Sequence, residues 1–440
     1  MTASAPWRRV RQMIDRRATP RVILTSGFVV FLLYAYPGYL TFESADQLID
    51  ARTRVIGDWH SPMMSQVWWL IEGITAGSFG MLAVQSGLVL LGAYALLRRV
   101  LPARGAALAA SGVLLFPPVL APIAVIWRDA QMAGFLLAGA AAVTSARRPV
   151  KLVGLGLVFL GCGMRDTAIY GALPIVVLGL SWRDGLRGWQ RGAIAAAAWL
   201  AIAAGSVWYE AAITEVVTLR EPVERAASDI AGILRYAGPI DDAELTRALV
   251  GAPLAVHQGI QAHARARRLP EIGNGGLFEP ATTPAAREAM LAGRDRLARA
   301  FPRVYLVTRW HAFYRLIGPR PVSPVYTSFL EAPELRAAVG QLATPSWTQR
   351  GLVAAVRWLG ETWLFWPLLY LALALGLLAI AVRRRDASAA MLLGSGLAYE
   401  VSLLWDATTA DYRLSHWMVL CTVLAGVILL ARRIAPPFAG

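Results

Sequence analysis

Residues 37–62 read PGYLTFESADQLIDARTRVIGDWHSP and lie between the first hydrophobic segment and an aromatic-rich apolar run. If residues 43–54 are helical, four polar side chains are spaced i, i+3, i+4 and i+7 and share one face. These four residues are Glu43, Asp46, Gln47 and Asp50. An ordinary solvated loop helix would show the same spacing, so this stretch alone leaves a structural and a functional interpretation open.

The composition identifies the class of protein. Of 440 residues, 57% are hydrophobic and only 16% are charged, against roughly 25% charged residues in soluble domains. The chain is therefore predicted to be a polytopic membrane protein. Its net charge of +15 comes from arginines at the ends of apolar segments, which is typical of membrane topology and argues against nucleic-acid binding. Cys162 and Cys421 lie in apolar runs, which argues against disulfides and thiolate metal sites.

The pattern of apolar runs and arginine clusters predicts about ten transmembrane helices with both termini in the cytoplasm. The expected spans are residues 22–36, 79–97, 106–127, 130–144, 152–164, 169–180, 193–209, 352–382, 387–405 and 414–431. Pro117-Pro118 interrupts the third of them. Residues 62–76 are too short and too polar to span, so we expect an interfacial helix with Trp68 and Trp69 at headgroup level.

Three regions follow from this topology. Residues 1–209 form an N-terminal transmembrane module whose first external loop is residues 37–62. Residues 210–350 contain charges of both signs and no apolar run long enough to span a membrane. This composition predicts an extracytoplasmic, mainly helical domain. Within it, residues 301–317 interleave aromatic residues with arginines, as in a helix that lies on a membrane surface. Residues 351–440 hold the C-terminal transmembrane helices.

Acidic and basic residues recur together in the external turns. They are Glu43, Asp46, Asp58 and His60 in the first loop, then Arg128-Asp129, Arg165-Asp166, and Asp406, Asp411 and Arg413. Charged groups at this depth are costly unless they are paired or functional. For one turn, a local Arg–Asp pair at a helix end is a sufficient explanation. Four such turns on the same side predict a shared polar site.

The motifs in these turns are similar to those of a known family. They are PGYLTFESADQ (37–47), DWHSP (58–62), WRDAQMAGFLL (127–137), GMRDTAIYGALP (163–174) and ADYRLSHWMVL (410–420). Their order resembles the GT-C superfamily of integral-membrane glycosyltransferases, particularly bacterial members that use polyprenyl-phosphate sugars. The resemblance covers residues 36–209 and the last three spans. Glu43 stands where the family has an aspartate, and Ser61 replaces a proline.

The resemblance implies an all-α, GT-C-like fold in the bacterial cytoplasmic membrane, with an active site that faces outward. There, a sugar would move from a polyprenyl-phosphate donor to a cell-envelope glycan, lipid or protein, with inversion. Either Glu43 or Asp46 would act as the carboxylate base. The residues expected to bind donor phosphate or acceptor are Asp58, His60, Arg128, Arg165 and Arg413. Supporting roles fall to Gln47, Asp129, Asp166 and Asp411, and a divalent cation is possible.

Other functions fit parts of the pattern. A transporter or flippase of lipid-linked substrates would also have about ten spans, but transporters place charges near the midplane on broken helices. A membrane acyltransferase would carry a histidine within a span, and no central span here has one. A non-catalytic assembly protein stays open. We interpret His257, His263, His311 and His416 as ordinary external or boundary residues.

Overall fold

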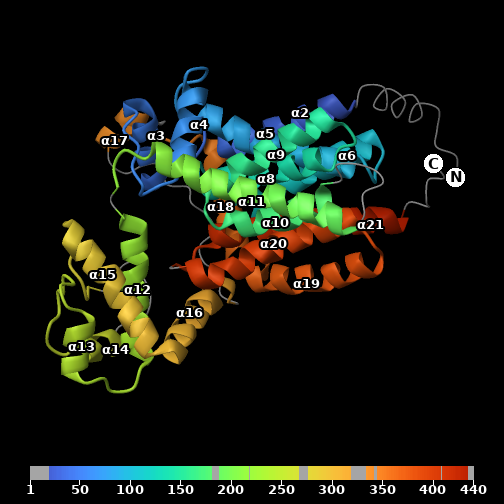
Figure 1. Cartoon of the computed structure of the whole chain (residues 1–440). Coiled ribbons are helices and arrows are strands. Elements are labelled where there is room, and N and C mark those ends of the chain that lie inside the picture. Colours follow the sequence, from blue (N-terminus) through green and yellow to red (C-terminus); the bar gives the residue numbers. More distant parts are fainter. Residues whose placement is uncertain are drawn as a thin grey trace, which may run out of the picture.

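The computed structural model describes residues 19–180, 188–217, 219–266, 276–318, 333–340, 344–407 and 409–434. These residues form an all-helical protein with three isolated β-bridges and no strand among them (Figure 1). The helices of the N-terminal module are α2 (Pro20–Ala35), α3 (Phe42–Thr53), α4 (Pro62–Glu72), α5 (Phe79–Leu97), α6 (Ala103–Leu115), α7 (Pro117–Ile123), α8 (Arg128–Val143), α9 (Arg148–Met164), α10 (Ala168–Gly179) and α11 (Gly188–Ile213).

A separate lobe projects from one end of the helical bundle (Figure 1). Between the N-terminal module and the last helices, the chain forms α12 (Arg220–Tyr236), α13 (Asp242–Ala248), α14 (Ile260–Ala266), α15 (Pro284–Ala300), α16 (Pro302–Ile317) and α17 (Pro333–Val339). The lobe has its own apolar core, to which α12 contributes Ile230, Ile233 and Leu234 and α15 contributes Leu297. This helical lobe lies within the stretch 210–350, while α17 of the same stretch packs apart from the lobe, against α3.

The last part of the chain consists of α18 (Trp347–Gly360), η1 (Trp363–Phe365), α19 (Pro367–Arg383), α20 (Ala387–Asp406), η2 (Tyr412–Ser415) and α21 (His416–Ile434). The single span expected at residues 352–382 is wrong, because the helix breaks between Gly360 and Pro367. Thr362 caps the short 3-10 turn η1, and Pro367 begins a new helix, where its missing N–H costs no helical hydrogen bond.

Four described helices are long and apolar enough to cross a membrane, namely α5, α11, α20 and the segment from Tyr412 to Ile434. A fifth crossing is possible through α6 and α7, which are bent by 67° at the expected proline interruption. The other expected spans correspond to helices of 12 to 17 residues. The apolar helices identify a membrane protein.

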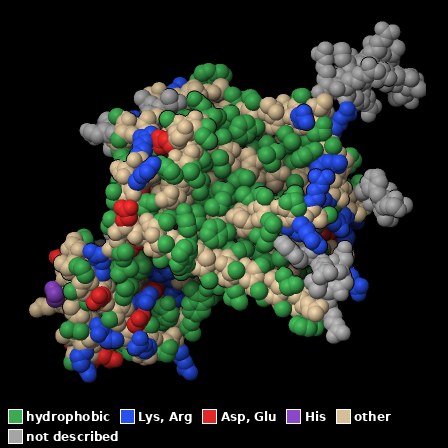
Figure 2. Space-filling model, turned by 45° about the horizontal axis from the view of Figure 1, so that its top comes forward, with side chains coloured by type: hydrophobic (Ala, Val, Ile, Leu, Met, Phe, Trp, Pro, Cys, Tyr) green, Lys and Arg blue, Asp and Glu red, His purple; other side chains and the backbone are tan. Residues whose placement is uncertain are grey.

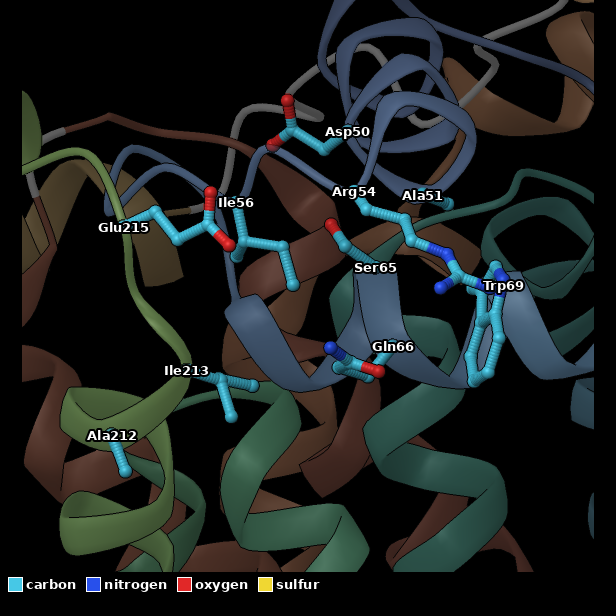
Figure 3. Close-up of a pocket in the computed structure, with 10 residues that line it drawn as sticks. All are labelled: Asp50, Ala51, Arg54, Ile56, Ser65, Gln66, Trp69, Ala212, Ile213 and Glu215. Atoms are coloured by element: carbon cyan, nitrogen blue, oxygen red, sulfur yellow. The ribbon is translucent and has the colours of Figure 1, made fainter.

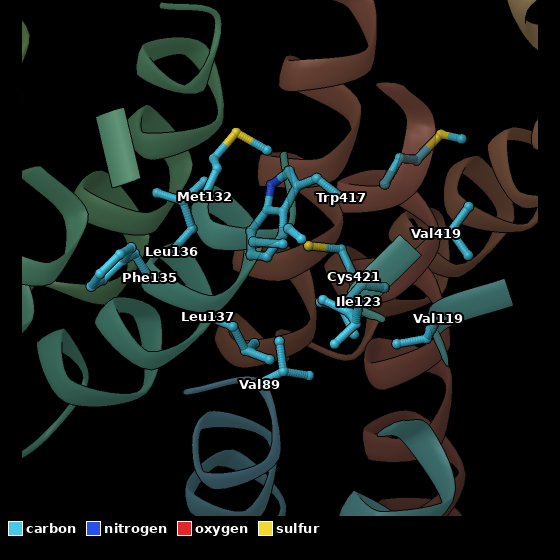
Figure 4. Packing of buried hydrophobic residues seen from close by; sticks show 14 of the residues in the cluster. Val89, Val119, Ile123, Met132, Phe135, Leu136, Leu137, Trp417, Val419 and Cys421 are labelled. Carbon is cyan, nitrogen blue, oxygen red and sulfur yellow. The ribbon is translucent and has the colours of Figure 1, made fainter. Parts of the chain in front are cut away.

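The centre of the bundle is closely packed around α8. Met132 and Leu137 of α8 meet Val89 of α5, Ile123 of α7 and Trp417 of α21, all of them buried (Figure 4). Helix α5 approaches α8 through a glycine: a Cβ on Gly92 would lie only 3.0 Å from a backbone nitrogen of α8. Small residues at such contacts allow helix backbones to come together in a membrane.

One expected membrane-surface residue belongs to the core instead. Trp68 of α4 is completely buried and its indole donates a hydrogen bond to the Gly77 carbonyl at 3.2 Å. Trp69, the next residue along the helix, stays partly exposed. A helix turns by about 100° per residue, so the two indoles point in different directions and only Trp69 is available to a membrane surface.

The surface has the layout of a membrane protein. Figure 2 shows an apolar surface over the middle of the bundle, with basic side chains gathered at the end opposite the lobe. Arg98 directly follows α5, and Arg383 and Arg432 lie in the last turns of α19 and α21. The lobe, in contrast, carries acidic and basic side chains together (Figure 2).

Candidate functional site

The first loop is tied to the last helices by an ion pair. Thr41 caps α3 in a capping box with Ser44, which places Glu43 in the first helical turn. Arg413 of η2 binds both carboxylate oxygens of Glu43, at 2.6 and 3.0 Å. Its guanidinium also lies 4.9 Å from the centre of the Trp127 ring, a cation–π contact. This ion pair therefore joins two residues that are 370 positions apart in the chain.

The same arginine continues the network toward two other turns. Arg413 Nε lies 3.1 Å from Asp411 Oδ2 and 3.9 Å from Asp129 Oδ2. Asp129 accepts a 2.7 Å hydrogen bond from Arg165 Nη1. Arg165 Nη2 in turn donates to Asp406 at 3.1 Å. Asp129 and Arg165 are almost completely buried, so each depends on the other for its charge to be tolerated.

The lobe completes the network from the other side. Arg225 of α12 pairs with Asp406 at 2.7 Å and lies 3.6 Å from Glu221. Glu221 binds both terminal nitrogens of Arg128, at 3.0 and 3.1 Å. Partial burial opposes ionisation of Glu221, but Arg128 outweighs it and lowers the pKa of this carboxyl to about 2. One continuous set of ion pairs thus joins the first loop, three other turns and the lobe.

A cavity of about 240 Å³ lies beside this network. Of the residues expected at the site, the cavity wall includes Asp58, His60, Arg128, Arg165 and Asp166. The lining also contains Glu210 of α11 and Glu221 of α12. The other expected binding and base residues, Glu43, Asp46 and Arg413, lie outside this lining.

His60 connects the cavity to the acidic helix. Its ring stacks on Trp59 at 4.3 Å between centroids, and its Nε2 lies 3.9 Å from Asp46 Oδ2, too far for a hydrogen bond. Within the described residues this buried nitrogen has no hydrogen-bond partner. Burial lowers the pKa of His60 to about 4, so the imidazole is neutral at pH 7 and can serve a ligand in the cavity.

Glu43 and Asp46 differ in their electrostatic surroundings. Partial burial opposes ionisation of Glu43, but the Arg413 guanidinium outweighs this effect and lowers the pKa of Glu43 to about 2. Burial raises the pKa of Asp46, against the opposing charge of Arg220. A carboxylate with a raised pKa accepts a proton more readily, so Asp46 is the better base of the two.

The alternative explanation, a local Arg–Asp pair at a helix end, applies to the last turn, where Asp411 contacts Arg413. The arginines of the other two turns pair with more distant residues. Arg128 pairs with Glu221, while Arg165 pairs with Asp129 of the preceding turn and with Asp406. Asp166 lies on the cavity wall, where burial of the carboxyl and the nearby Glu221 carboxylate raise its pKa.

The remaining first-loop residues have several environments. The Asp58 carboxylate accepts the Leu219 backbone N–H at 2.7 Å and so holds the start of α12 against the loop. Gln47 is buried, and its amide nitrogen has no hydrogen-bond partner within the described chain. Asp50 faces a different cavity from the one beside His60. The shared acidic face of α3 is therefore divided among separate environments.

The sequence interpretation missed Glu221 and Arg225. They are spaced i, i+4 on α12, a pattern that is common on any solvated helix. Only their ion pairs with Arg128 at the start of α8 and Asp406 at the end of α20 distinguish them from surface residues. Nothing in their local sequence could have assigned them to the site.

The described residues offer no cluster for the possible divalent cation. No group of three or more His, Cys, Asp or Glu side chains in this part of the chain is arranged to hold a metal ion. On the cavity wall Glu221 is paired with Arg128, whereas Asp166 and Glu210 face the cavity.

Comparison with known proteins gave no match: no family model fits the chain, and no curated protein and no solved structure is significantly similar to it. The functional conclusion therefore depends on the geometry above and on the sequence motifs.

Proposed function

We propose that this protein is a membrane glycosyltransferase of the GT-C type, with about ten spans and both termini in the cytoplasm. It transfers a sugar from a polyprenyl-phosphate donor to an acceptor outside the bacterial cytoplasmic membrane. The acceptor is a cell-envelope glycan, a lipid or a protein. The observation that carries the proposal is the arginine-walled cavity between the acidic first loop and the lobe.

Two guanidinium groups can bind a lipid-phosphate donor at this cavity, whose wall also carries the carboxylates of Asp58, Asp166, Glu210 and Glu221. Arg128 and Arg165 lie on its wall, and guanidinium groups match phosphate oxygens with two hydrogen bonds. Both arginines are held by carboxylates, which fixes their position before a ligand arrives. Preorganised positive charge stabilises a leaving phosphate at little reorganisation cost.

Asp46 is the proposed base. The acceptor hydroxyl attacks the anomeric carbon from the face opposite the phosphate, and its proton passes to the Asp46 carboxylate. The bond between the anomeric carbon and the phosphate oxygen breaks, and its electron pair leaves with the polyprenyl phosphate. Glu43 is bound by Arg413 on both oxygens and acts as a positioning residue for α3.

The test uses the purified full-length protein in lipid nanodiscs, with a panel of polyprenyl-phosphate sugars as donors and alkyl glycosides as acceptors. We expect Asp46→Asn to lower the transfer rate by roughly 10²- to 10⁴-fold, the usual contribution of a general base. Glu43→Gln should lower the rate less and should also lower the melting temperature, because it weakens the contact with Arg413. Full activity in both variants would exclude both carboxylates as the base.

Donor binding is measured separately by native mass spectrometry with polyprenyl phosphate alone. Arg128→Gln should weaken this binding, whereas Arg303→Gln, at an exposed position of α16, should leave it unchanged. If lipid phosphate binds but no donor supports transfer, a flippase or an assembly protein becomes the better conclusion.

A further inference from the structure

A second cavity, of about 380 Å³, lies between α3, α4 and the end of α11 (Figure 3). It is separated from the cavity at His60 by a short backbone connection. The Glu215 N–H donates to the Ile56 carbonyl at 2.9 Å, and the Asp58 N–H donates to the Val216 carbonyl at 3.1 Å. Asp58 lines the first cavity, whereas Ile56 and Glu215 line the second. The two cavities thus adjoin along the same loop.

One wall of the second cavity is formed by two stacked planar groups. The Arg54 guanidinium lies 4.4 Å from the centre of the Trp69 ring, and Figure 3 shows the two groups side by side. Arg54 ends α3 with a φ of 61°, a left-handed conformation that side chains other than glycine and asparagine seldom adopt. The chain reverses direction at this residue, and the guanidinium lies over the indole.

The opposite side offers hydrogen-bond acceptors above an apolar floor. In Figure 3 the carboxylates of Asp50 and Glu215 lie across the cavity from Trp69, and the Gln66 amide lies below them. Ala212 and Ile213 of α11 supply the apolar part of the lining. Carboxylates and an amide oxygen accept hydrogen bonds from hydroxyl groups, while the apolar floor suits C–H groups.

Charge and size restrict the class of ligand. The single guanidinium on this wall is stacked on Trp69 and two carboxylates face it, so the second cavity lacks the pair of arginines that can bind a phosphate at the first cavity. The burial of Asp50 and the nearby Asp46 carboxylate raise the pKa of Asp50 to about 6, which lowers the attraction for cations. The volume is at the lower end of the roughly 300–1,000 Å³ typical of small-molecule sites, enough for a small polar ring system.

We infer that this cavity binds a neutral, hydroxyl-rich sugar unit, with hydroxyls on Asp50, Gln66 and Glu215 and the apolar ring face toward Ala212 and Ile213. If the proposed glycosyl transfer is correct, this sugar belongs to the acceptor and the adjoining cavity holds the donor phosphate. The assignment to the acceptor depends on the proposed function, but the binding of a neutral sugar can be tested without it.

The test is saturation-transfer difference NMR on the full-length protein in detergent micelles, with methyl glycosides of glucose, mannose and galactose as probes. At least one probe should give a signal that falls at least fivefold in Ala212→Trp, which fills the cavity. Ala204→Trp is the matched control, because it adds the same side chain to an exposed position of the same helix. Its signal should equal that of the unmodified protein.

Charged probes decide the class of ligand. Glucose 1-phosphate should not displace the bound glycoside, and methyl glucosaminide should bind no better than the neutral probes. Preference for either charged sugar, or equal signals in the two tryptophan variants, would overturn the inference. Glu215→Gln, at an exposed position, replaces Ala212→Trp if that variant does not fold, and should lower the signal at least twofold; an unchanged signal would again overturn it.

Glycoside binding is measured without any donor. If the glycoside signal depends on the cavity but the protein has no transfer activity, the result contradicts the proposed function and leaves the sugar site standing. Normal transfer to an alkyl glycoside in Ala212→Trp would contradict the acceptor assignment and leave the proposed function standing.

Discussion

At the scale of single residues, two carboxylates one turn apart on α3 have different chemistry because different partners face them. Glu43 is bound by a guanidinium on both oxygens, whereas Asp46 has a neutral imidazole as its neighbour, 3.9 Å away. The first arrangement favours a permanent charge, and the second leaves a carboxylate that can take up a proton. This contrast is why we assign proton transfer to Asp46.

His60 gives a prediction about pH. Its pKa is about 4 in the folded protein, against 6.5 for an ordinary histidine. Between these values the unfolded chain binds a proton that the folded protein does not, so stability falls as the pH is lowered. The slope from this residue is at most about 1.4 kcal/mol per pH unit. Between about pH 7 and about pH 5, the melting temperature of His60→Gln should therefore fall less than that of the unmodified protein.

The measurement is the melting temperature in detergent micelles by tryptophan fluorescence. The difference in pH sensitivity should be roughly 2 °C or more. His257→Gln serves as the control, because His257 lies at an exposed position of the lobe; it should behave as the unmodified protein does. Identical pH dependence in all three proteins would show that burial does not hold the imidazole neutral.

How far the sequence predicts this site depends on what helix periodicity can reveal. The spacing of Glu43, Asp46 and Asp50 predicts a shared side of α3, and the helix is present. Periodicity does not reveal which surface packs opposite each residue. Arg413 and Glu221 become partners of first-loop and turn residues only through tertiary packing, so the pairing of charges required the structure.

At the scale of elements, two prolines mark helix breaks. The predicted interruption at Pro117 is confirmed, and the single span predicted across Pro367 is wrong. Pro117 marks the expected interruption, and α6 and α7 bend there by 67°. Pro367 begins a new helix after the end of α18 at Gly360, but the high apolar content around it hid the change from α18 to α19. The capping residue Thr362 and Pro367 together are the local signal that could have divided this segment.

The contact between α16 and α20 gives a prediction about stability. Arg309 is almost completely buried and pairs with buried Asp229 at 3.0 Å. It also donates to the carbonyls of Leu404 and Ala407, at 3.0 and 2.9 Å, and so caps the end of α20. Arg309→Met would leave an unpaired buried carboxylate, which typically costs about 3–5 kcal/mol. We expect a clear fall in melting temperature and faster proteolysis between the lobe and the bundle.

Adding Asp229→Asn to Arg309→Met should recover part of the loss, because the buried charge is removed along with its partner. Arg303→Met, at an exposed position of the same helix, should have little effect. If the double variant is as unstable as the sum of its two single variants, the two side chains do not interact as the geometry indicates.

At the scale of the whole molecule, charge and shape define two opposite ends. Basic side chains gather at one end of the bundle, and the lobe with the first loop lies at the other (Figures 1 and 2). The alternation of arginine clusters allowed the sequence to predict this arrangement. Helix lengths are less informative, because several of the expected crossings are shorter than the roughly 20 residues a straight span requires.

The orientation in the membrane can be tested with single cysteines. Both natural cysteines are buried, so a membrane-impermeant maleimide should label the unmodified protein weakly. Ile74→Cys lies next to the first loop at a position that is 87% exposed, and Asp242→Cys lies on the lobe. Because arginine-rich turns stay in the cytoplasm, both should be labelled in spheroplasts with an intact membrane. Arg148→Cys, at the start of α9, should be labelled only after the membrane is permeabilised. Labelling of Arg148→Cys alone before permeabilisation would reverse the orientation and place the arginine-walled cavity in the cytoplasm, where the proposed transfer to an external acceptor could not occur.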